Sequence, residues 1–292
     1  MNALPSRFVT FASVLAILTS ASALRAEESD LNKIVAAAQN GDPEAERLLG
    51  RAYFKGDGVP QDYVKAFEYF EKSAKQGNAA GQNNLGVMFD QGVGGYKDYA
   101  KAVEWYQKAA EQGDAIAQKN LGYMYEEGRG VTLDIPQAIE WYLKAANQGL
   151  VEAAACLGSL YYHEHPDIKA NYPEAARWFT IAAEKGNIEA INNLAVMYEY
   201  GMVVPKDSKK AFELYQTAAN HGDMRAQGNL GQMYFGGNGT AQDYVLAEKW
   251  LTLGVDQHDA AAEKFRNEAE HRMTAEQIEQ GRKLAAEFKS TK

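Results

Sequence analysis

Clusters of basic residues are missing from this sequence, although charged residues are common. The chain has 30 lysines and arginines against 39 aspartates and glutamates, which gives a net charge of −9. A nucleic-acid backbone and an anionic lipid surface both favour proteins with gathered lysine and arginine side chains. We therefore expect neither nucleic acid nor a lipid surface as the partner.

Cysteine is almost absent, since Cys156 is the only one in 292 residues. A single cysteine excludes a framework of internal disulfides. Its neighbours Ala155 and Leu157 are apolar. We interpret Cys156 as a small buried residue of a helix and not as a reactive thiol.

The apolar segment near the N-terminus is too short to span a membrane. It covers residues 8–18 (FVTFASVLAIL), whereas a spanning helix needs about 20 such residues. Arg7 precedes this segment and small residues follow it, as in a secretory signal. We predict that residues 1–26 are a signal peptide cleaved after Ala23 or Ala26, with an uncleaved anchor as the alternative. The mature chain is then expected in the periplasm, or alternatively secreted, without stable membrane insertion.

One unit of 36 residues repeats along most of the chain. A leucine, followed by glycine in five of six copies, recurs in steps of 36, 36, 36, 37 and 36. These motif leucines are Leu49, Leu85, Leu121, Leu157, Leu194 and Leu230. A column of glycines has the same steps: Gly41, Gly77, Gly113, Gly149, Gly186 and Gly222. Two columns with one period indicate a repeat architecture.

Each repeat predicts two helices. In the first helix, an aromatic residue follows the motif leucine by four positions, which places both on one face. In the second helix, small and aromatic residues form a buried stripe, as in Ala102, Trp105, Tyr106 and Ala109. All four tryptophans fall in one column of this stripe, which we interpret as core.

The helix ends are periodic as well. An Asp or Asn that can serve as an N-cap precedes each second helix, and a glycine suited to a left-handed turn follows it. The predicted N-caps are Asp62, Asp98, Asp134, Asn171, Asp207 and Asp243.

We therefore predict an all-α fold, a right-handed solenoid of stacked antiparallel helix pairs. Residues 27–41 form an N-terminal half-repeat helix, residues 42–259 form six repeats, and residues 260–292 form capping helices. Terminal repeats of a solenoid are expected to differ from the internal ones in this way.

These residues resemble the Sel1-like repeat family, relatives of the tetratricopeptide repeats. The resemblance is carried by the 36-residue unit, the Leu-Gly-x-x-Tyr motif, the Gly-x-Gly-Val loop and the Lys-Ala-x-Glu-Trp-Tyr-x-Lys-Ala-Ala helix, clearest at 98–110 and 128–146. It implies a protein-interaction adaptor of the bacterial cell envelope, for example a periplasmic inhibitor of a membrane sensor that controls exopolysaccharide. A cysteine-rich secreted branch of the family implies the alternative, an enzyme that binds β-lactams or peptidoglycan fragments.

No cluster of residues predicts catalysis or a cofactor. His163, Glu164, His165 and Asp167 are of metal-ligand type, but the other histidines are distant in sequence, so we interpret this segment as a polar loop. The glycine clusters at 92–95 and 236–239 follow helices, whereas a phosphate loop follows a strand. We therefore expect a protein without enzymatic activity, cofactor or metal.

The remaining candidate is a surface formed by the first helices, which line the concave side in tetratricopeptide relatives. Two rows on this surface differ between repeats while the core columns do not, as expected of a groove that binds a protein or peptide. The row two residues after the motif leucine is Arg51, Val87, Tyr123, Ser159, Val196 and Gln232. The row five residues after it is Phe54, Asp90, Glu126, Tyr162, Glu199 and Phe235. We expect exposed aromatics in these rows to anchor the partner.

Overall fold

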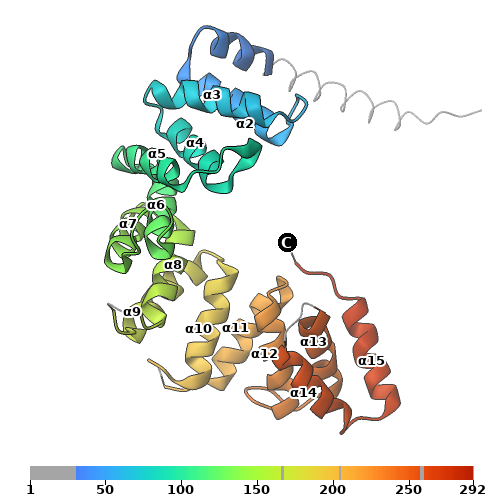
Figure 1. Cartoon of the computed structure of the whole chain (residues 1–292). Coiled ribbons are helices and arrows are strands. Elements are labelled where there is room, and N and C mark those ends of the chain that lie inside the picture. Colours follow the sequence, from blue (N-terminus) through green and yellow to red (C-terminus); the bar gives the residue numbers. More distant parts are fainter. Residues whose placement is uncertain (1–30, 166–167, 204, 257–259, 292) are drawn as a thin grey trace, which may run out of the picture. The chain divides into compact units, whose positions relative to one another are not determined.

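The structure is a computed structural model that describes residues 31–165, 168–203, 205–256 and 260–291. The predicted signal peptide, residues 1–26, lies outside these residues. The described part is helical, apart from its turns, a 3₁₀ turn (η1, Val93–Gly95) and an isolated bridge between His165 and Ile168. The all-α prediction is therefore confirmed (Figure 1).

Each repeat contributes two helices, as predicted. The first helices are α2 (Pro43–Lys55), α4 (Ala79–Gln91), α6 (Ala115–Glu127), α8 (Val151–Tyr162), α10 (Ile188–Tyr200) and α12 (Met224–Gly236). The second helices are α3 (Tyr63–Lys75), α5 (Tyr99–Glu111), α7 (Ile135–Asn147), α9 (Tyr172–Glu184), α11 (Ser208–Asn220) and α13 (Tyr244–Asp256). Two further helices follow, α14 (Ala260–Glu270) and α15 (Ala275–Ala286).

The chain forms two compact units, Met1–Leu133 and Asp134–Lys292. In the first unit, each helix from α2 to α6 packs on the next one in sequence. The same holds in the second unit from α7 to α13, and α14 and α15 pack on α13. Each unit is thus a stack of helix pairs, which is the solenoid arrangement.

The helix ends confirm the capping prediction. The side chain of each predicted N-cap accepts a hydrogen bond from a backbone N–H in the first turn, as Asp98 does from Lys101 at 3.1 Å. The glycine after each second helix has a positive φ, for example +87° at Gly77. Among the first helices, α8 lacks a side-chain cap, since Leu150 stands at its N-cap and makes no side-chain hydrogen bond.

The glycine after the motif leucine allows close contact between the two helices of one repeat. A Cβ added at Gly86 would lie 2.6 Å from the ring of Tyr106, and one at Gly50 would lie 2.7 Å from the ring of Phe70. The second helix can therefore place an aromatic ring directly on the backbone of the first.

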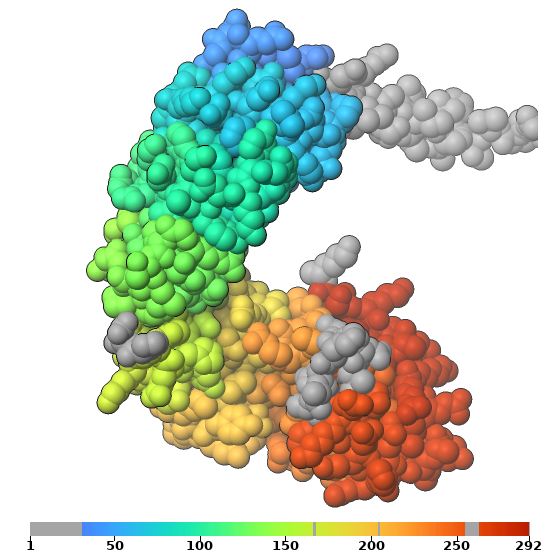
Figure 2. Space-filling model, in the orientation of Figure 1, coloured from blue at the N-terminus to red at the C-terminus, as the bar shows by residue number. Residues whose placement is uncertain are grey.

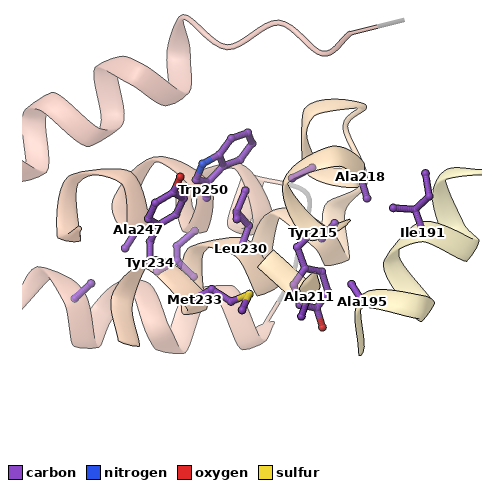
Figure 3. Packing of buried hydrophobic residues seen from close by; sticks show 14 residues of the cluster. Ile191, Ala195, Ala211, Tyr215, Ala218, Leu230, Met233, Tyr234, Ala247 and Trp250 are labelled. Atoms are coloured by element: carbon purple, nitrogen blue, oxygen red, sulfur yellow. The ribbon is translucent and has the colours of Figure 1, made fainter. Parts of the chain in front are cut away.

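The motif leucines and the second aromatic of the stripe form the core. Leu85 and Leu121 are 1% exposed, and Tyr142 and Tyr215 are fully buried. Figure 3 shows this core in the second unit, where Leu230 and Met233 of α12 lie among residues of α11 and α13.

Two sequence predictions about burial need correction. Trp178 and Trp250 are buried, but Trp105 and Trp141 are only half-buried. Lysine ammonium groups lie over the latter rings, with Lys144 Nζ 3.6 Å from the Trp141 centroid. Cys156 is half-buried as well and not buried, because it lies one position away from the core column of α8.

The C-terminal helices pack on the last repeat (Figure 2). The α15 helix begins with a capping box formed by Thr274 and Gln277. Its Arg282 donates hydrogen bonds to Glu248 of α13, which is fully buried, and to Glu270 of α14.

At the N-terminal end of the described residues, a helix at 31–39 packs on α2 through Ala38, Ala45 and Leu49. No helix of the described part is long and apolar enough to cross a membrane.

Candidate functional site

The twelve predicted contact residues all lie on the first helices, but few of them are freely exposed. Arg51 is exposed and the other eleven are half-buried. Half-burial means that each of these side chains also contacts the protein itself. The two rows have to be considered separately, because the partners of their residues differ.

The row five residues after the motif leucine pairs with the second helix of the same repeat. Glu199 accepts a 2.7 Å hydrogen bond from the hydroxyl of the buried Tyr215. Tyr162 instead packs on Phe179, with ring centroids 6.3 Å apart. The same pairing joins Phe54 to Phe70, at 6.4 Å.

The residue type at each position of this row therefore depends on the residue that it contacts on the second helix of the same repeat. In the first five repeats, a carboxylate is found where the second helix carries a tyrosine, and an aromatic ring where it carries a phenylalanine. In the sixth repeat, the second helix carries Leu251 at this position, and Phe235 is again aromatic. Asp90 lies near the buried Tyr106, and burial raises the pKa of its carboxyl. The differences between repeats that predicted a partner-binding row are explained, at these positions, by packing inside each repeat.

The aromatic side chains predicted as anchors are engaged by neighbours. Phe235 packs on Tyr244 and on Phe265 of α14, and the guanidinium of Arg272 lies 5.0 Å from its ring centroid. Tyr123 is half-buried, with the guanidinium of Arg129 5.0 Å from its ring. The C-terminal helix α14 thus covers the last position of the row.

A pocket of about 340 Å³ opens on the first helices of the second unit. It brings together three of the predicted residues, Ser159, Tyr162 and Val196, while Glu199 and Gln232 do not line it. Sequence reasoning missed the rest of the lining, which is His163, Phe179, Glu189, Asn192, Asn193, Arg225 and Asn229.

The polar lining of this pocket includes three carboxamides, Asn192, Asn193 and Asn229. Asn192 is 2% exposed, and its Oδ1 has no hydrogen-bond partner. Its Nδ2 donates a long hydrogen bond of 3.5 Å to Oδ1 of Asn193. An unpartnered acceptor in a buried position is costly for a folded protein, so Asn192 calls for an explanation.

The charges at the pocket compensate each other. Arg225 NH2 lies 3.4 Å from a carboxylate oxygen of Glu189 and 4.0 Å from one of Asp223. Burial raises the pKa of the Tyr162 hydroxyl, with Tyr172 and Tyr200 nearby, so this group stays neutral at physiological pH. The pocket therefore offers neutral donors and acceptors beside a balanced ion pair.

A column of asparagines could have pointed to this pocket in the sequence. The residue before the motif leucine is Asn in four of the six repeats: Asn84, Asn120, Asn193 and Asn229. Cys156 and Leu48 occupy this position in the other two repeats.

Of the histidine loop, the structure describes His163, Glu164 and His165. Among the residues described, no three His, Cys, Asp or Glu side chains are grouped as ligands. Asp167, which the sequence placed in this loop, lies outside the described residues.

Comparison with known proteins identifies the repeat. The sequence model of the Sel1 repeat matches six consecutive segments of the chain, residues 43–78, 79–114, 115–150, 151–187, 188–223 and 225–259. Among curated proteins, none matches.

Solved structures agree with the repeat assignment. A protective antigen of uropathogenic Escherichia coli, described as displaying an SLR fold, is 35% identical with a TM-score of 0.85 over 90% of this chain. The chain spans 56% of the length of that protein. A Sel1 repeat protein from Oxalobacter formigenes is 32% identical with a TM-score of 0.72, over 81% of this chain and 95% of that one.

A third solved structure is that of a protein described as cysteine rich. Helicobacter pylori cysteine rich protein B is 26% identical over 44% of this chain and 96% of that one, with a TM-score of 0.37. Similarity at this level supports no argument about function. None of the comparisons supports the β-lactam or peptidoglycan-fragment alternative.

Proposed function

Because this chain belongs to the Sel1 repeat family, whose members are generally protein-interaction scaffolds, we propose that it binds a partner polypeptide on the first helices of its second unit. The pocket between α8, α10 and α12 is the contact site. The observation that carries this proposal is the convergence of Ser159, Tyr162 and Val196, which come from two successive repeats, on one pocket. The proposed function requires no catalytic arrangement of side chains.

The mechanism is recognition by a surface that exists before binding. Helix α8 is fixed by Leu157 and helix α10 by Ala195, both of which are fully buried. The pocket therefore forms without the partner, and binding does not incur the entropy of ordering a loop. Tyr162 presents a large ring with a polar end, which is the type of side chain enriched at binding hot spots.

The remaining predicted residues are a secondary contact surface. Within the first unit, Arg51, Val87 and Tyr123 are the residues of the row two after the motif leucine. We include them as a separate contact surface of the first unit. The row of Phe54, Asp90 and Glu126 contributes mainly by fixing the helix pairs.

Crosslinking from the pocket tests this function. A photoreactive amino acid at Val196 should crosslink a discrete partner in cells of the source bacterium. The same amino acid at Ile181, an exposed residue of α9, should not. Tyr162→Ala should remove the crosslink from Val196 while the purified variant stays helical by circular dichroism. Identical products from Val196 and Ile181, or none from Val196, would contradict the proposal.

We place this function in the bacterial cell envelope because of the N-terminal segment. Residues 8–18 are apolar, Arg7 precedes them, and small residues follow. Fractionation of cells that express the full chain, with a variant lacking residues 2–26 as the control, tests this placement. The full chain should be found in the periplasmic fraction and shortened to begin at Leu24 or Glu27, whereas the variant should stay in the cytoplasm.

A further inference from the structure

Two equivalent pairs of asparagines differ between the units of this protein. Asn83 and Asn192 each lie two residues before a motif leucine, and Asn120 and Asn229 each lie one residue before the motif leucine of the next repeat. Between repeats two and three, Asn120 Nδ2 donates a 2.9 Å hydrogen bond to Oδ1 of Asn83. This bond is the closed state of the pair.

The equivalent pair in the second unit is open. Oδ1 of Asn192 has no hydrogen-bond partner, so Asn229 does not donate to it. Both side chains instead line the 340 Å³ pocket. The pocket thus contains two carboxamides that in the other pair satisfy each other.

We propose that Asn192 and Asn229 recognise the main chain of an extended polypeptide segment. This inference rests on the proposed function and specifies its ligand. A peptide group carries one N–H donor and one C=O acceptor. An N–H of the segment donates to Asn192 Oδ1, and a C=O accepts from Asn229 Nδ2, so the segment replaces the hydrogen bond that the closed pair makes.

The chemistry of the pocket favours an extended segment over a helix. Inside a helix, the main-chain N–H and C=O groups are already paired with each other, whereas an extended segment leaves them free. A small anion is not favoured either, because Glu189 and Asp223 already lie beside Arg225. Val196 and the buried Phe179 supply an apolar wall for a side chain of the segment.

A comparison of two leucine variants tests the first half of this inference. Asn192→Leu removes an acceptor that is unsatisfied in the free protein, so its melting temperature should equal or exceed that of the wild type. Asn83→Leu breaks a satisfied pair and leaves Asn120 alone, so its melting temperature should fall. A fall for Asn192→Leu as large as that for Asn83→Leu would overturn the inference, because Asn192 would then be satisfied inside the protein.

Binding measurements test the second half. Linear peptides selected from a phage-displayed random library on the full chain are synthesised, and their Kd values are measured by fluorescence anisotropy. Asn192→Leu and Asn229→Leu should each weaken binding at least tenfold, whereas Asn83→Leu should leave the Kd unchanged. Methylation of one backbone nitrogen of the peptide should weaken binding to the wild type but not weaken it further with Asn192→Leu.

The outcomes separate this inference from the proposed function. If Asn192→Leu and backbone methylation leave the Kd unchanged while Tyr162→Ala weakens binding, main-chain recognition is wrong and the binding surface stands. If no selected peptide is sensitive to Asn192→Leu, Asn229→Leu or Tyr162→Ala, both are wrong. A selection that yields no binding peptide overturns the inference as well, and the crosslink from Val196 then decides the proposed function alone.

Discussion

The hydroxyl of Tyr215 donates a 2.7 Å hydrogen bond to Oε2 of Glu199, which joins the two helices of the fifth repeat. Burial, with the carboxylate of Glu199 nearby, raises the pKa of the tyrosine, so the donor keeps its proton. In the second repeat the acid is Asp90, which is one methylene shorter, and its Oδ1 has no partner. The shorter acid thus leaves an oxygen without a partner where the longer one accepts the tyrosine hydroxyl.

Removal of the Tyr215 hydroxyl should destabilise the protein. We expect Tyr215→Phe to lower the free energy of unfolding by about 1.5–3 kcal/mol, because a hydrogen bond to a charged acceptor is lost. Urea denaturation measures the change. Tyr200→Phe is the control, since Tyr200 is 67% exposed and its replacement should change stability by less than about 0.5 kcal/mol. Equal effects of the two variants would show that the hydrogen bond between Tyr215 and Glu199 contributes nothing to the free energy of unfolding.

A methyl group at Gly86 should force the helices of the second repeat apart. Its Cβ would lie 2.6 Å from the Tyr106 ring, so Gly86→Ala should lower stability by about 1–3 kcal/mol despite the better helix propensity of alanine. Gly236→Ala is the matched control, because the nearest atom to its Cβ is the flexible end of Asn238. Thermal unfolding of both variants distinguishes the effect of packing from that of helix propensity. A higher melting temperature for Gly86→Ala than for the wild type would contradict the close contact.

A missing N-cap offers a stabilising substitution. Leu150 has the backbone conformation of the other N-caps, with φ −70° and ψ 108°, but no side-chain acceptor. Leu150→Asp should raise the free energy of unfolding by about 0.5–2 kcal/mol, since it supplies an acceptor to the first turn of α8. The reverse change, Asp114→Leu, removes the bond that Asp114 accepts from Ala117 and should cost a similar amount. Chemical denaturation of the pair tests whether the two changes have opposite signs.

The buried Glu248 should make stability depend on pH. Burial is the main cause that raises the pKa of its carboxyl above the ordinary value of 4.5, and the neighbouring Glu270 acts in the same direction. The folded state therefore holds this proton more tightly than the unfolded state. The stability that Glu248 contributes is complete below about pH 4.5 and is lost as the pH rises through the raised pKa.

Replacement of this carboxyl by an amide isolates its effect. Glu248→Gln should match the wild type near pH 4 and become more stable than it as the pH rises towards 8. Unfolding by urea at several pH values measures the difference, with Glu279→Gln on the exposed face of α15 as the control. A difference that shrinks with rising pH would mean that Arg282 lowers the pKa of Glu248 more than burial raises it.

The repeat period predicted most of the fold. Leu85 and its equivalents, Asp98 as an N-cap and Gly77 after a helix are local signals, and each is confirmed by the structure. Burial at one position of a helix was harder to predict, because it depends on the neighbouring repeat. Trp105, for example, is half-buried while Trp178, in the same column, is buried.

The candidate site was predicted only in part, for a related physical reason. Variation at Glu199 was interpreted as a sign of partner binding, although it follows Tyr215 on the adjacent helix. The pair of Asn192 and Asn229 is open, whereas the equivalent pair in the first unit is closed with the same residue types. Residue identity alone cannot distinguish these two states.

Phe265 of α14 lies on Phe235 at the end of the last repeat, and this contact has a consequence for assembly. An uncovered terminal repeat would present its apolar side to a second molecule, and identical molecules could then join end to end into filaments. Here the chain's own helix already occupies that side. We therefore expect α14 to block end-to-end assembly through the last repeat.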